Sequence, residues 1–511
     1  MYASPHTIDT QKQELNSPSP SKILTAMSMD SQSEPNLMEI DPGLPRPNGS
    51  TPYWLHELHP RADIQSSSLP THVDVVVIGS GITGLSTANT LLKRHPTIQV
   101  TVLEARSICS GATGRNGGNL VAYGGVTYKN IKQVRSQAMA TKIVEFTFRN
   151  IRQTKDMMKE SPTLAKVSEY RELTRIRTFA DQSSLDAARQ SVAEFVQDNP
   201  KYRGLYEFVE DPKTLREQYG LHGVVGAVLF DAAGLWPYRF VMGTWERLLV
   251  DFPGRLTLEA RTPVISVSHN SENIKFPYIV ATQRGNIRAS HVVHCTNGYA
   301  GHLLPRLRGT LYPFQGVMTV QDFEDSCNQP NQGAKLSWSI HGQPPVSAKD
   351  QNTPPSIYYL NQNALSGYYF FGGAEGEHGP TITGDDSQVP RSTVDHLRSK
   401  LGAFLGRKPN VENRLISSWS GIMGFTADED PLVGRLPQSI TDRNGKGEWI
   451  AAGFNGMGMS LCIASGEAIA CLVLGLDVSS WLPEVYGIQE ERVHKNMMSS
   501  KGRDPALTAS L

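Results

Sequence analysis

The sequence predicts an α/β protein in which a discontinuous domain built around a parallel sheet is combined with an α+β domain on a mostly antiparallel sheet. Three observations predict this architecture. A short apolar run leads directly into a glycine-rich turn at residue 79, and a second apolar run leads into another glycine-rich turn at residue 453. Between them lie aromatic stretches with the alternating pattern of half-buried strands. The chain therefore leaves the first domain and returns to it.

The first strand and turn have the pattern of a dinucleotide site. Residues 73–78 are apolar and β-branched, as in a strand buried on both faces, and residues 82–93 follow with helical spacing. Gly79 would make the tight turn, Gly81 would leave room for a pyrophosphate, and Gly84 would let the helix pack closely. The free N–H groups at the start of that helix would face the phosphates. The residues of the turn and first helical turn expected at the ligand are Gly79, Gly81, Ile82, Thr83 and Gly84.

The second strand, residues 99–103, ends in an acid. Glu104, followed by Ala105, lies about 20 residues after the last glycine of the turn, where a carboxylate bonds the ribose hydroxyls of a dinucleotide. A 2′-phosphate would be repelled there. Strand, glycine turn, helix and acid together predict a Rossmann-like domain.

Composition excludes several classes of protein. The chain has 511 residues, with 49 Lys and Arg balanced by 49 Asp and Glu, so nothing electrostatic favours nucleic acid or an anionic membrane. The five cysteines have no paired or metal-like spacing, which predicts reduced thiols in an intracellular protein and no metal site. The stretch 449–475 contains too many glycine and polar residues for a membrane span.

The two ends of the chain are expected to lie outside the folded domains. Residues 1–50 are rich in Ser, Pro, Asn and Gln and predict a disordered tail, and residues 476–511 form a C-terminal extension. The tail has neither the apolar core of a secretory signal nor the arginines of a transit peptide, so we expect a cytoplasmic protein. The last residues, Ala509-Ser510-Leu511, only partly match a peroxisomal address, which makes that compartment the weaker alternative.

After Glu104, the chain carries Ser110-Gly111-Ala112-Thr113-Gly114-Arg115-Asn116-Gly117-Gly118-Asn119. This segment resembles the "GASGRNGGQ" stretch of the FAD-dependent oxidoreductases of the glycine oxidase and D-amino acid oxidase type. Within that family it is most similar in style to gamma-glutamylputrescine oxidase and to fungal members. The resemblance implies FAD as the cofactor. It also implies that the loop runs along FAD, with contacts from Thr113, Gly114, Arg115, Asn116 and Gly117.

Three later segments resemble the same family. Residues 262–267 are similar to the strand that bonds the adenine through its backbone, and residues 291–298 to a strand and turn that touch the cofactor. Residues 419–434 and 453–459 are similar to "WAG…TPDGLPVIG" and "GFSGHGM". In the family the last loop faces the flavin pyrimidine edge; its usual His is Met457 here. The resemblance implies cofactor contacts from Val264, Asn297, Gly424, Asn455, Gly456, Met457 and Gly458.

The resemblance also implies the domain organisation. The FAD-binding domain would comprise residues 72–150, 220–300 and 410–475, and the substrate domain residues 155–220 and 305–405. Residues 311–320 alternate loosely, and residues 356–360 with 368–372 predict a hairpin of aromatic strands. In the sarcosine oxidase branch a Cys near the position of Met423 holds the flavin covalently. No Cys is close to it here, so we expect non-covalent FAD.

The substrate side is less well specified. Weak candidates for catalytic residues are Trp236, Tyr359 and Tyr369, and Tyr358, Tyr368 and Gln315 are further candidates for substrate contact. Amino acid oxidases commonly bind a substrate carboxylate with an Arg. The available arginines are Arg171, Arg175, Arg239 and Arg435, and no pattern singles one out.

The expected reaction is oxidation of a C–N bond in a small amine or amino acid, with hydride transfer to flavin N5 and formation of an imine. Oxygen or another acceptor would reoxidise the flavin. A flavin-binding protein with a non-catalytic or trafficking role is one alternative, since the family's loop His is absent. A flavin monooxygenase is another, although no second glycine motif for NAD(P)H is present.

Overall fold

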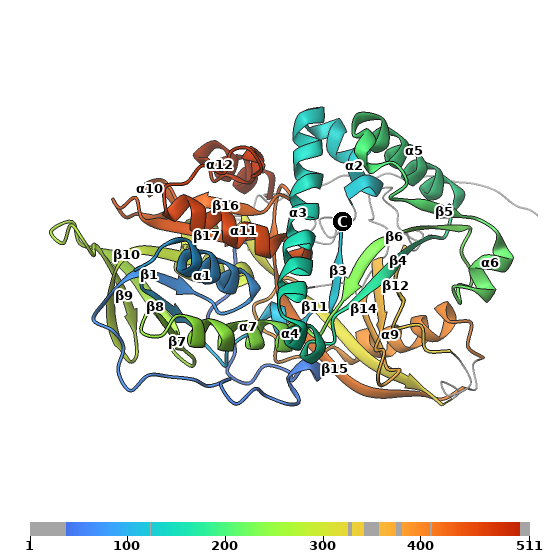
Figure 1. The fold of residues 1–511 in the computed structure, drawn as a ribbon, viewed down its shortest axis with the longest axis horizontal. Coiled ribbons are helices and arrows are strands. Elements are labelled where there is room, and N and C mark those ends of the chain that lie inside the picture. The colour runs from blue at the N-terminus through green and yellow to red at the C-terminus, as the bar shows by residue number, and fades with distance from the viewer. Residues whose placement is uncertain are drawn as a thin grey trace, which may run out of the picture. The chain divides into compact units, whose positions relative to one another are not determined.

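A computed structural model describes residues 37–122, 124–324, 330–341, 357–374, 381–408 and 411–500, and its helices and strands are arranged in two halves (Figure 1). The first part of the expected tail, residues 1–36, and the C-terminal residues 501–511 with the partial peroxisomal address lie outside the described residues.

The first half is built on an eight-stranded sheet. Its central five strands run parallel, because β1 pairs in parallel with both β10 and β2, and these pair in parallel with β17 and β7. The strands in spatial order are β16 (Leu432–Arg435), β17 (Glu448–Ala452), β10 (Gly285–His294), β1 (His72–Ile78), β2 (Val100–Leu103) and β7 (Leu256–Glu259), extended by β9 (Tyr278–Thr282) and β8 (Val264–His269). The predicted discontinuous Rossmann-like half is thereby confirmed.

Two helices join the distant glycine-rich segments on this sheet. The expected first helix is α1 (Ile82–Arg94), and the second glycine turn leads into α11 (Gly458–Val473). The two helices pack closely: Ser86 Oγ donates to the Ile463 carbonyl at 2.5 Å, and a Cβ on Gly466 would lie 2.7 Å from the Thr83 carbonyl oxygen. Small residues at the contact let the backbones approach. Helices α7 (Pro237–Asp251) and α3 (Gln137–Glu160) border the same half (Figure 1).

The second half is built on a nine-stranded, mostly antiparallel sheet, as predicted. The aromatic hairpin is present, because β13 and β14 pair antiparallel with Tyr359 opposite Gly372. The strands in spatial order are β15 (Asn413–Thr426), β11 (Leu311–Phe323), β14 (Tyr369–Ala374), β13 (Ile357–Gln362), β12 (Leu336–His341), β4 (Arg171–Phe179), β6 (Gly226–Gly234) and β3 (Asn119–Val121), with β5 (Glu207–Val209) beside β6. The other helices are α2 (Gly124–Val134), α4 (Pro162–Val167), α5 (Gln182–Asp198), α6 (Pro212–Glu217), α8 (Ala300–Leu303), α9 (Arg391–Phe404), α10 (Gln438–Thr441) and α12 (Glu490–Ser500).

The strands divide between the halves differently from the expected domain pieces. Strands β6 and β15 fall within 220–300 and 410–475, which the sequence analysis gave to the FAD-binding domain, yet both pair in the second sheet. Strand β3, within 72–150, does so as well. Strand β15 pairs with β11 along its length and lies in the other half from the parallel strands (Figure 1). Periodicity predicts that a segment is a strand but carries no information on the sheet it joins.

The expectation of a disordered tail over residues 1–50 needs correction for its second part. Met38 is 1% exposed and packs with Tyr312 and Phe314, although few large apolar residues surround it in the sequence. Asp41 pairs with Arg308 at 2.7 Å, and Ser50 N donates to the Asp386 carbonyl at 2.8 Å. Composition alone could not reveal these anchors, because each has its partner hundreds of residues away.

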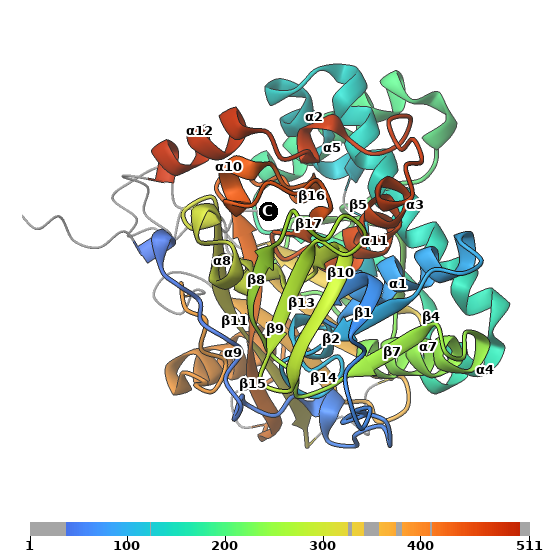
Figure 2. The ribbon, with the colours of Figure 1, turned by 90° about the vertical axis from the view of Figure 1, so that its left-hand side faces the viewer.

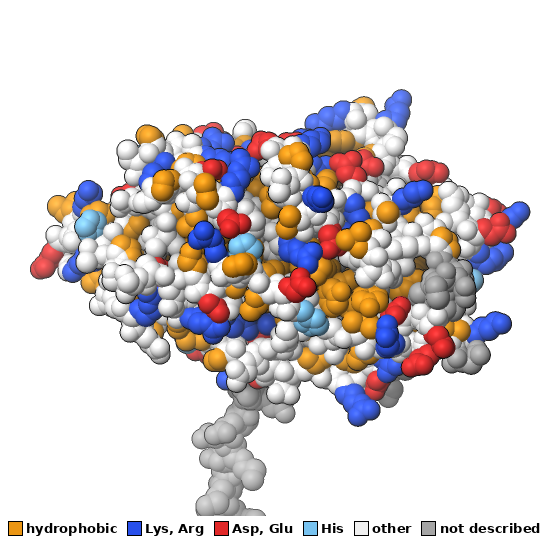
Figure 3. Space-filling view, turned by 60° about the horizontal axis from the view of Figure 1, so that its bottom comes forward, with side chains coloured by type: hydrophobic (Ala, Val, Ile, Leu, Met, Phe, Trp, Pro, Cys, Tyr) orange, Lys and Arg blue, Asp and Glu red, His pale blue; other side chains and the backbone are white. Residues whose placement is uncertain are grey.

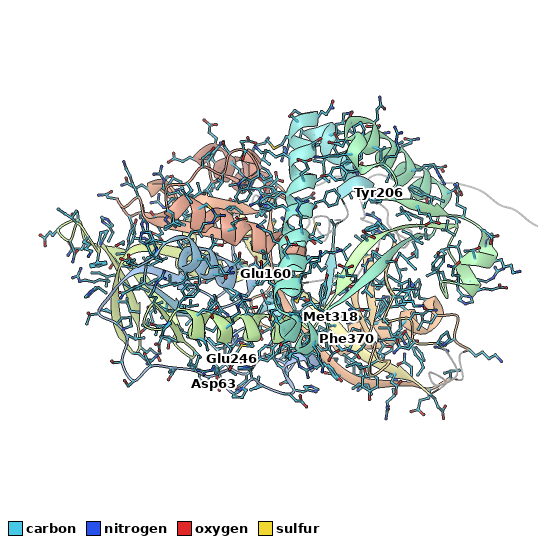
Figure 4. All side chains as sticks on the ribbon, in the orientation of Figure 1. Asp63, Glu160, Tyr206, Glu246, Met318 and Phe370 are labelled. Carbon is cyan, nitrogen blue, oxygen red and sulfur yellow. The ribbon has the colours of Figure 1, made fainter. Side chains whose placement is uncertain are left out.

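The two halves share one large apolar core, and the described surface is mixed in charge. Met318 and Phe370 belong to this core and lie where the second sheet meets the other half (Figure 4). On the face in Figure 3, basic and acidic side chains are interspersed with small apolar groups. Among the described helices, none has the length and apolar character of a membrane span.

A buried ion pair inside the first sheet gives a prediction for stability. Glu448 is 1% exposed, accepts a bond from Arg443 Nε at 2.8 Å and lies 2.8 Å from His294 Nε2. Burial opposes its ionisation, but the bonds from His294 and Arg443 outweigh burial and lower the pKa of Glu448 from 4.5 to about 2. Because the folded pKa lies below the unfolded one, the stabilisation is present above pH 4.5 and is lost as the pH falls towards 2.

Glu448→Gln is therefore expected to lower the free energy of unfolding at pH 7 by about 3 kcal/mol, because it leaves Arg443 without its buried countercharge. Thermal melting of both proteins between pH 7 and pH 3 checks this. The difference in melting temperature between the two proteins should shrink below pH 4.5, where the stabilisation by ionised Glu448 begins to be lost. A constant difference over that range would contradict the pKa argument.

Candidate active site

A cavity of about 1270 Å³ is lined by both glycine-rich segments and by strands of the second sheet. It exceeds the roughly 300–1,000 Å³ of most small-molecule pockets, so it has room for a dinucleotide together with a substrate. Residues from the start of α1, from the end of β2 and from the start of α11 line it, and β4, β11 and β13 contribute its other wall.

The first glycine turn forms a cradle that side chains would fill. Gly79 has φ +108°, and a Cβ there would lie 2.6 Å from the Cys295 carbonyl oxygen. A Cβ on Gly81 would lie 2.9 Å from Thr113 Oγ1, which also accepts the N–H of Ile82 at 3.1 Å. The other N–H groups at the start of α1 face the cavity with the positive end of the helix dipole. This arrangement fits a pyrophosphate.

Glu104 lies at the cavity beside this turn. One carboxylate oxygen accepts from Ser80 N at 3.1 Å and Ser80 Oγ at 2.6 Å, and the other accepts from Arg106 N at 3.1 Å. These bonds hold the carboxylate in place at the end of β2, where the Rossmann pattern puts a ribose acceptor. Val264, the candidate for adenine contact, lines the same cavity at 3% exposure.

The loop after Glu104 lines the cavity. The side chain of Arg115, which the resemblance places along the cofactor, bonds backbone groups of the protein. Arg115 is buried, and its guanidinium donates to the Ser110 carbonyl at 2.8 Å and the Ser420 carbonyl at 2.8 Å. It also lies 3.4 Å from an Asp386 oxygen. Burial lowers its pKa to about 10, so it stays charged at neutral pH. The guanidinium of Arg115 therefore joins the loop to the second half.

The side chain of Asn116 is also used within the loop. Its Nδ2 donates to the Thr113 carbonyl at 2.9 Å, and its Oδ1 accepts from Gly118 N at 2.8 Å. These bonds shape the backbone that lines the cavity. Gly117 allows the aromatic ring of Tyr359 to approach, since a Cβ there would lie 3.0 Å from the ring.

The second glycine turn reaches the cavity through residues in the left-handed region. Asn455 has φ +50° and Gly456 has φ +77°. The side chain of Asn455 accepts from Thr426 N at 2.8 Å and donates to the Glu429 carbonyl at 2.8 Å, so it fixes the turn and does not point its amide at a ligand. Met457 N donates to the Phe454 carbonyl at 2.7 Å, and α11 then begins at Gly458, so the N-terminus of this helix lies at the cavity, a location suited to developing negative charge.

Three of the expected cofactor residues support the site from behind and do not line the cavity. A Cβ on Gly84 would lie 2.0 Å from the Gly79 carbonyl oxygen, one on Gly114 2.3 Å from the Cys109 carbonyl oxygen, and one on Gly424 2.4 Å from Asn297 Oδ1. The expected residues that line it are Gly79, Gly81, Ile82, Thr83, Glu104, Ala105, Thr113, Arg115, Asn116, Gly117, Val264, Asn297, Asn455, Gly456, Met457 and Gly458.

Of the three catalytic candidates, only Tyr359 lies at the cavity. Burial raises its pKa to about 12, so its hydroxyl remains a proton donor at neutral pH. Trp236 instead donates its Nε1–H to the Trp54 carbonyl at 2.9 Å, beneath the guanidinium of Arg239. Tyr369 packs edge-on against Phe323. Trp236 and Tyr369 therefore lie outside the cavity lining, with their rings packed in the core.

The structure singles out one arginine among those available and adds residues that the sequence analysis missed. Arg175 and Arg177 on β4 both line the cavity, as does His341 on β12. Residues two apart on a strand share a face, so the alternation of charge in this strand was a usable signal. Arg171 lies outside the cavity and donates to the Gly333 carbonyl at 2.6 Å.

Comparisons with known proteins agree with this geometry. The model of the family "FAD dependent oxidoreductase" matches residues 74–472, and the chain belongs to this family. It is therefore an oxidoreductase, and its cofactor is FAD. The cradle at Gly79 and Gly81 and the acid at Glu104 fit that cofactor.

Individual similarities are distant. The chain is 23% identical over 429 residues to "Probable oxidoreductase OrdL" of Haemophilus influenzae, covering 81% of this chain and 88% of that protein. It is 26% identical to the mitochondrial L-2-hydroxyglutarate dehydrogenase of Bos taurus over 260 residues, 48% of this chain and about half (51%) of the relative. The crystal structure of glycine oxidase from Geobacillus kaustophilus shares the fold, with a TM-score of 0.62 and 17% identity over 82% of this chain and 99% of the other.

The mode of FAD attachment gives a direct prediction. Met423 lines the cavity, and the lining cysteines among the described residues, Cys295 and Cys462, are buried with pKa values raised to about 12. At neutral pH they are thiols and not nucleophilic thiolates. Acid precipitation is therefore expected to leave all the yellow colour in the supernatant, as measured by absorbance. Colour that stays in the washed pellet would contradict non-covalent binding.

Proposed function

We propose that this chain oxidises the C–N bond of an amino acid, or of a closely related amine that carries a carboxylate, to an imine, with bound FAD accepting the hydride at N5. The observation that carries the proposal is the pair of arginines, Arg175 and Arg177, on the cavity wall formed by the second sheet.

The location of these arginines suits a carboxylate. Arg175 is 1% exposed and gives one N–H to Asn119 Oδ1 at 3.2 Å, while its side chain borders the cavity. Arg175 lies opposite Ser337 on β12 and Phe230 on β6, and Arg177 lies opposite Ser339 and Val228, so these cross-strand neighbours are uncharged. Two guanidinium groups in a site shielded from water attract an anion strongly, and their planar donors match a carboxylate.

Two further groups could orient the rest of the substrate. His341 Nε2 is buried and has no hydrogen-bond partner in the described structure. Burial, with Arg177 and Arg175 close by, lowers the pKa of His341 well below its usual value, so its ring is neutral and can accept a bond from an amine N–H. Tyr359 offers a hydroxyl from the neighbouring strand, next to the loop that lines the cofactor side. Such contacts would fix the C–H bond that is broken.

A second candidate reaction is oxidation of a 2-hydroxy acid at its C–O bond. It is favoured by the similarity to L-2-hydroxyglutarate dehydrogenases, and the same arginines would bind its carboxylate. Met457 replaces the His that the family usually has in this loop, so a flavin-binding protein with a non-catalytic role is a further alternative. The monooxygenase alternative differs from all of these because it consumes NAD(P)H.

Product analysis separates these reactions. The purified protein with added FAD is incubated in air, with an artificial electron acceptor present, with L- and D-amino acids, N-alkylated amino acids and 2-hydroxy acids, each with and without NAD(P)H. Release of ammonia or an alkylamine together with a 2-oxo acid supports the proposal. A 2-oxo acid formed only from hydroxy acids would replace it with the second reaction. NAD(P)H consumption with oxygen insertion would establish the monooxygenase, and no product from any substrate would favour a non-catalytic role.

A further inference from the structure

The segment of residues 37–55, here termed the N-terminal strap, lies along the outer side of the loop that lines the cavity after Glu104. Its contacts follow that loop in order. The Arg46 carbonyl accepts from Arg106 Nη1 at 3.2 Å, and Trp54 Nε1 donates to the Asn116 carbonyl at 2.6 Å. Between them, Ser50 Oγ lies 3.3 Å from Arg115 Nη1. Figure 2 shows the start of the strap in blue at the edge of the molecule.

The strap also contributes directly to the cavity wall. Gly43, Leu44 and Pro45 line the cavity together with Glu104 and Arg106. The carbonyl of Arg46, the next residue of the strap, accepts from Arg106, which lies two residues after Glu104, the ribose acceptor of the Rossmann pattern, so residues 43–45 are assigned to the adenosine end. Leu44 is 40% exposed, so part of its side chain is available for contact with a ligand.

A buried ionic cluster holds the middle of the strap. Asp386 is fully buried, 2.9 Å from Arg106 Nη1 and 3.4 Å from Arg115 Nε, and both arginines belong to the cofactor loop. Gly49 of the strap packs on this cluster: a Cβ there would lie 2.6 Å from Arg106 Nη1, 2.8 Å from Asp386 Oδ1 and 2.9 Å from Arg115 Nη2. The cluster therefore connects the loop, the strap and the segment before α9.

The beginning of the strap is anchored separately. Met38 is buried among Tyr312, Phe314 and Phe425, and Asp41 lies 2.7 Å from Arg308 and 3.0 Å from His302. The wall residues 43–45 are thus held on both sides, by the apolar anchor and by the ionic cluster. The strap precedes residues 74–472, the part of the chain that the family model matches.

We propose that Leu44 and Pro45 are binding residues for the adenosine half of FAD and that the N-terminal strap sets the rate at which FAD is released. The strap covers the adenosine end, and the Asp386 cluster keeps the strap closed on the loop. This role does not depend on which substrate the enzyme oxidises.

The test measures FAD release from the full-length holoprotein, followed as the rise in flavin fluorescence after dilution. Leu44→Ala removes the cover and leaves the ionic cluster intact. Gly49→Val forces the strap away from the cluster. Both are expected to release FAD about tenfold faster, since contact with the adenosine half would bury the exposed part of the Leu44 side chain, and such burial accounts for about that factor in affinity. Gly402→Ala in α9, where a Cβ meets only Phe323 at 3.9 Å, is the matched control and should release FAD at the native rate.

A second measurement locates the effect. ADP carries the adenosine and pyrophosphate without the flavin, and its affinity for the apoprotein of Leu44→Ala should fall by a factor similar to the change in FAD release. If Gly49→Val does not fold, Leu44→Ala decides alone, because a half-exposed side chain can be shortened with little loss of stability. A native FAD release rate or a native ADP affinity in folded Leu44→Ala would overturn the proposal.

Discussion

Gly81→Val is expected to give a folded protein that contains no FAD. The backbone at Gly81 is extended, with φ −65°, so valine is conformationally allowed there. The Cβ of valine, however, would lie 2.9 Å from Thr113 Oγ1, and its methyl groups would occupy the space between the glycine turn and Thr113. A backbone that cannot approach the pyrophosphate loses those hydrogen bonds, so FAD affinity should fall by about 100-fold or more.

The check is the ratio of flavin to protein absorbance after purification, together with the melting temperature of the apoproteins. Gly84→Val is the informative contrast. Its Cβ would lie 2.0 Å from the Gly79 carbonyl oxygen inside the strand–helix contact, so it should lower the melting temperature of the protein itself. Full retention of FAD by Gly81→Val would show that the dinucleotide lies elsewhere.

Arg175→Met is expected to reduce kcat/KM by about 100-fold or more for the best carboxylate substrate, because it removes one partner of a buried ion pair with the substrate. Arg175→Lys keeps the charge but loses the planar pair of donors, and its loss should be smaller. Bound FAD should change little in both variants, since Arg175 belongs to β4 in the second sheet and bonds the cofactor loop only at its last residue, Asn119.

Arg171→Met is the matched control on the same strand. Arg171 bonds the Gly333 carbonyl and Asn361 Oδ1 outside the cavity, so its loss should change stability more than KM. Steady-state kinetics on FAD-replete proteins, measured well below the melting temperature of each, compares the three. A native kcat/KM for Arg175→Met would contradict substrate binding by the arginines. The proposal of a carboxylate substrate would then lose its main support.

The parts of the fold that follow from contiguous residues were predictable. The strand, glycine turn and helix at residues 72–94 are determined by neighbours in the sequence, and β1 and α1 agree with the expectation within a residue. The aromatic hairpin of β13 and β14 was likewise readable from its alternation. In each case the chemistry of the segment and its local geometry agree.

The parts that depend on distant partners were not predictable. The guanidinium of Arg115 bonds the carbonyl of Ser420, and nothing within the glycine-rich loop indicates that partner. Likewise, nothing in the sequences of β6 and β15 indicates that they belong to the second sheet and not to the parallel one. The polar composition of the N-terminal strap also gave no indication that Met38 is buried. Arg177 and His341 meet at the cavity only because β4 and β12 pair in parallel.

The most direct test of the central claim is the visible spectrum of the FAD-loaded protein under anaerobic conditions during addition of amino acids, N-alkylated amino acids, polyamines, 2-hydroxy acids and NAD(P)H in turn. A carboxylate-bearing amine is expected to bleach the flavin band, and the band is expected to return when an electron acceptor is admitted. Bleaching by 2-hydroxy acids or by NAD(P)H, with every amine inert, would contradict C–N oxidation by this enzyme.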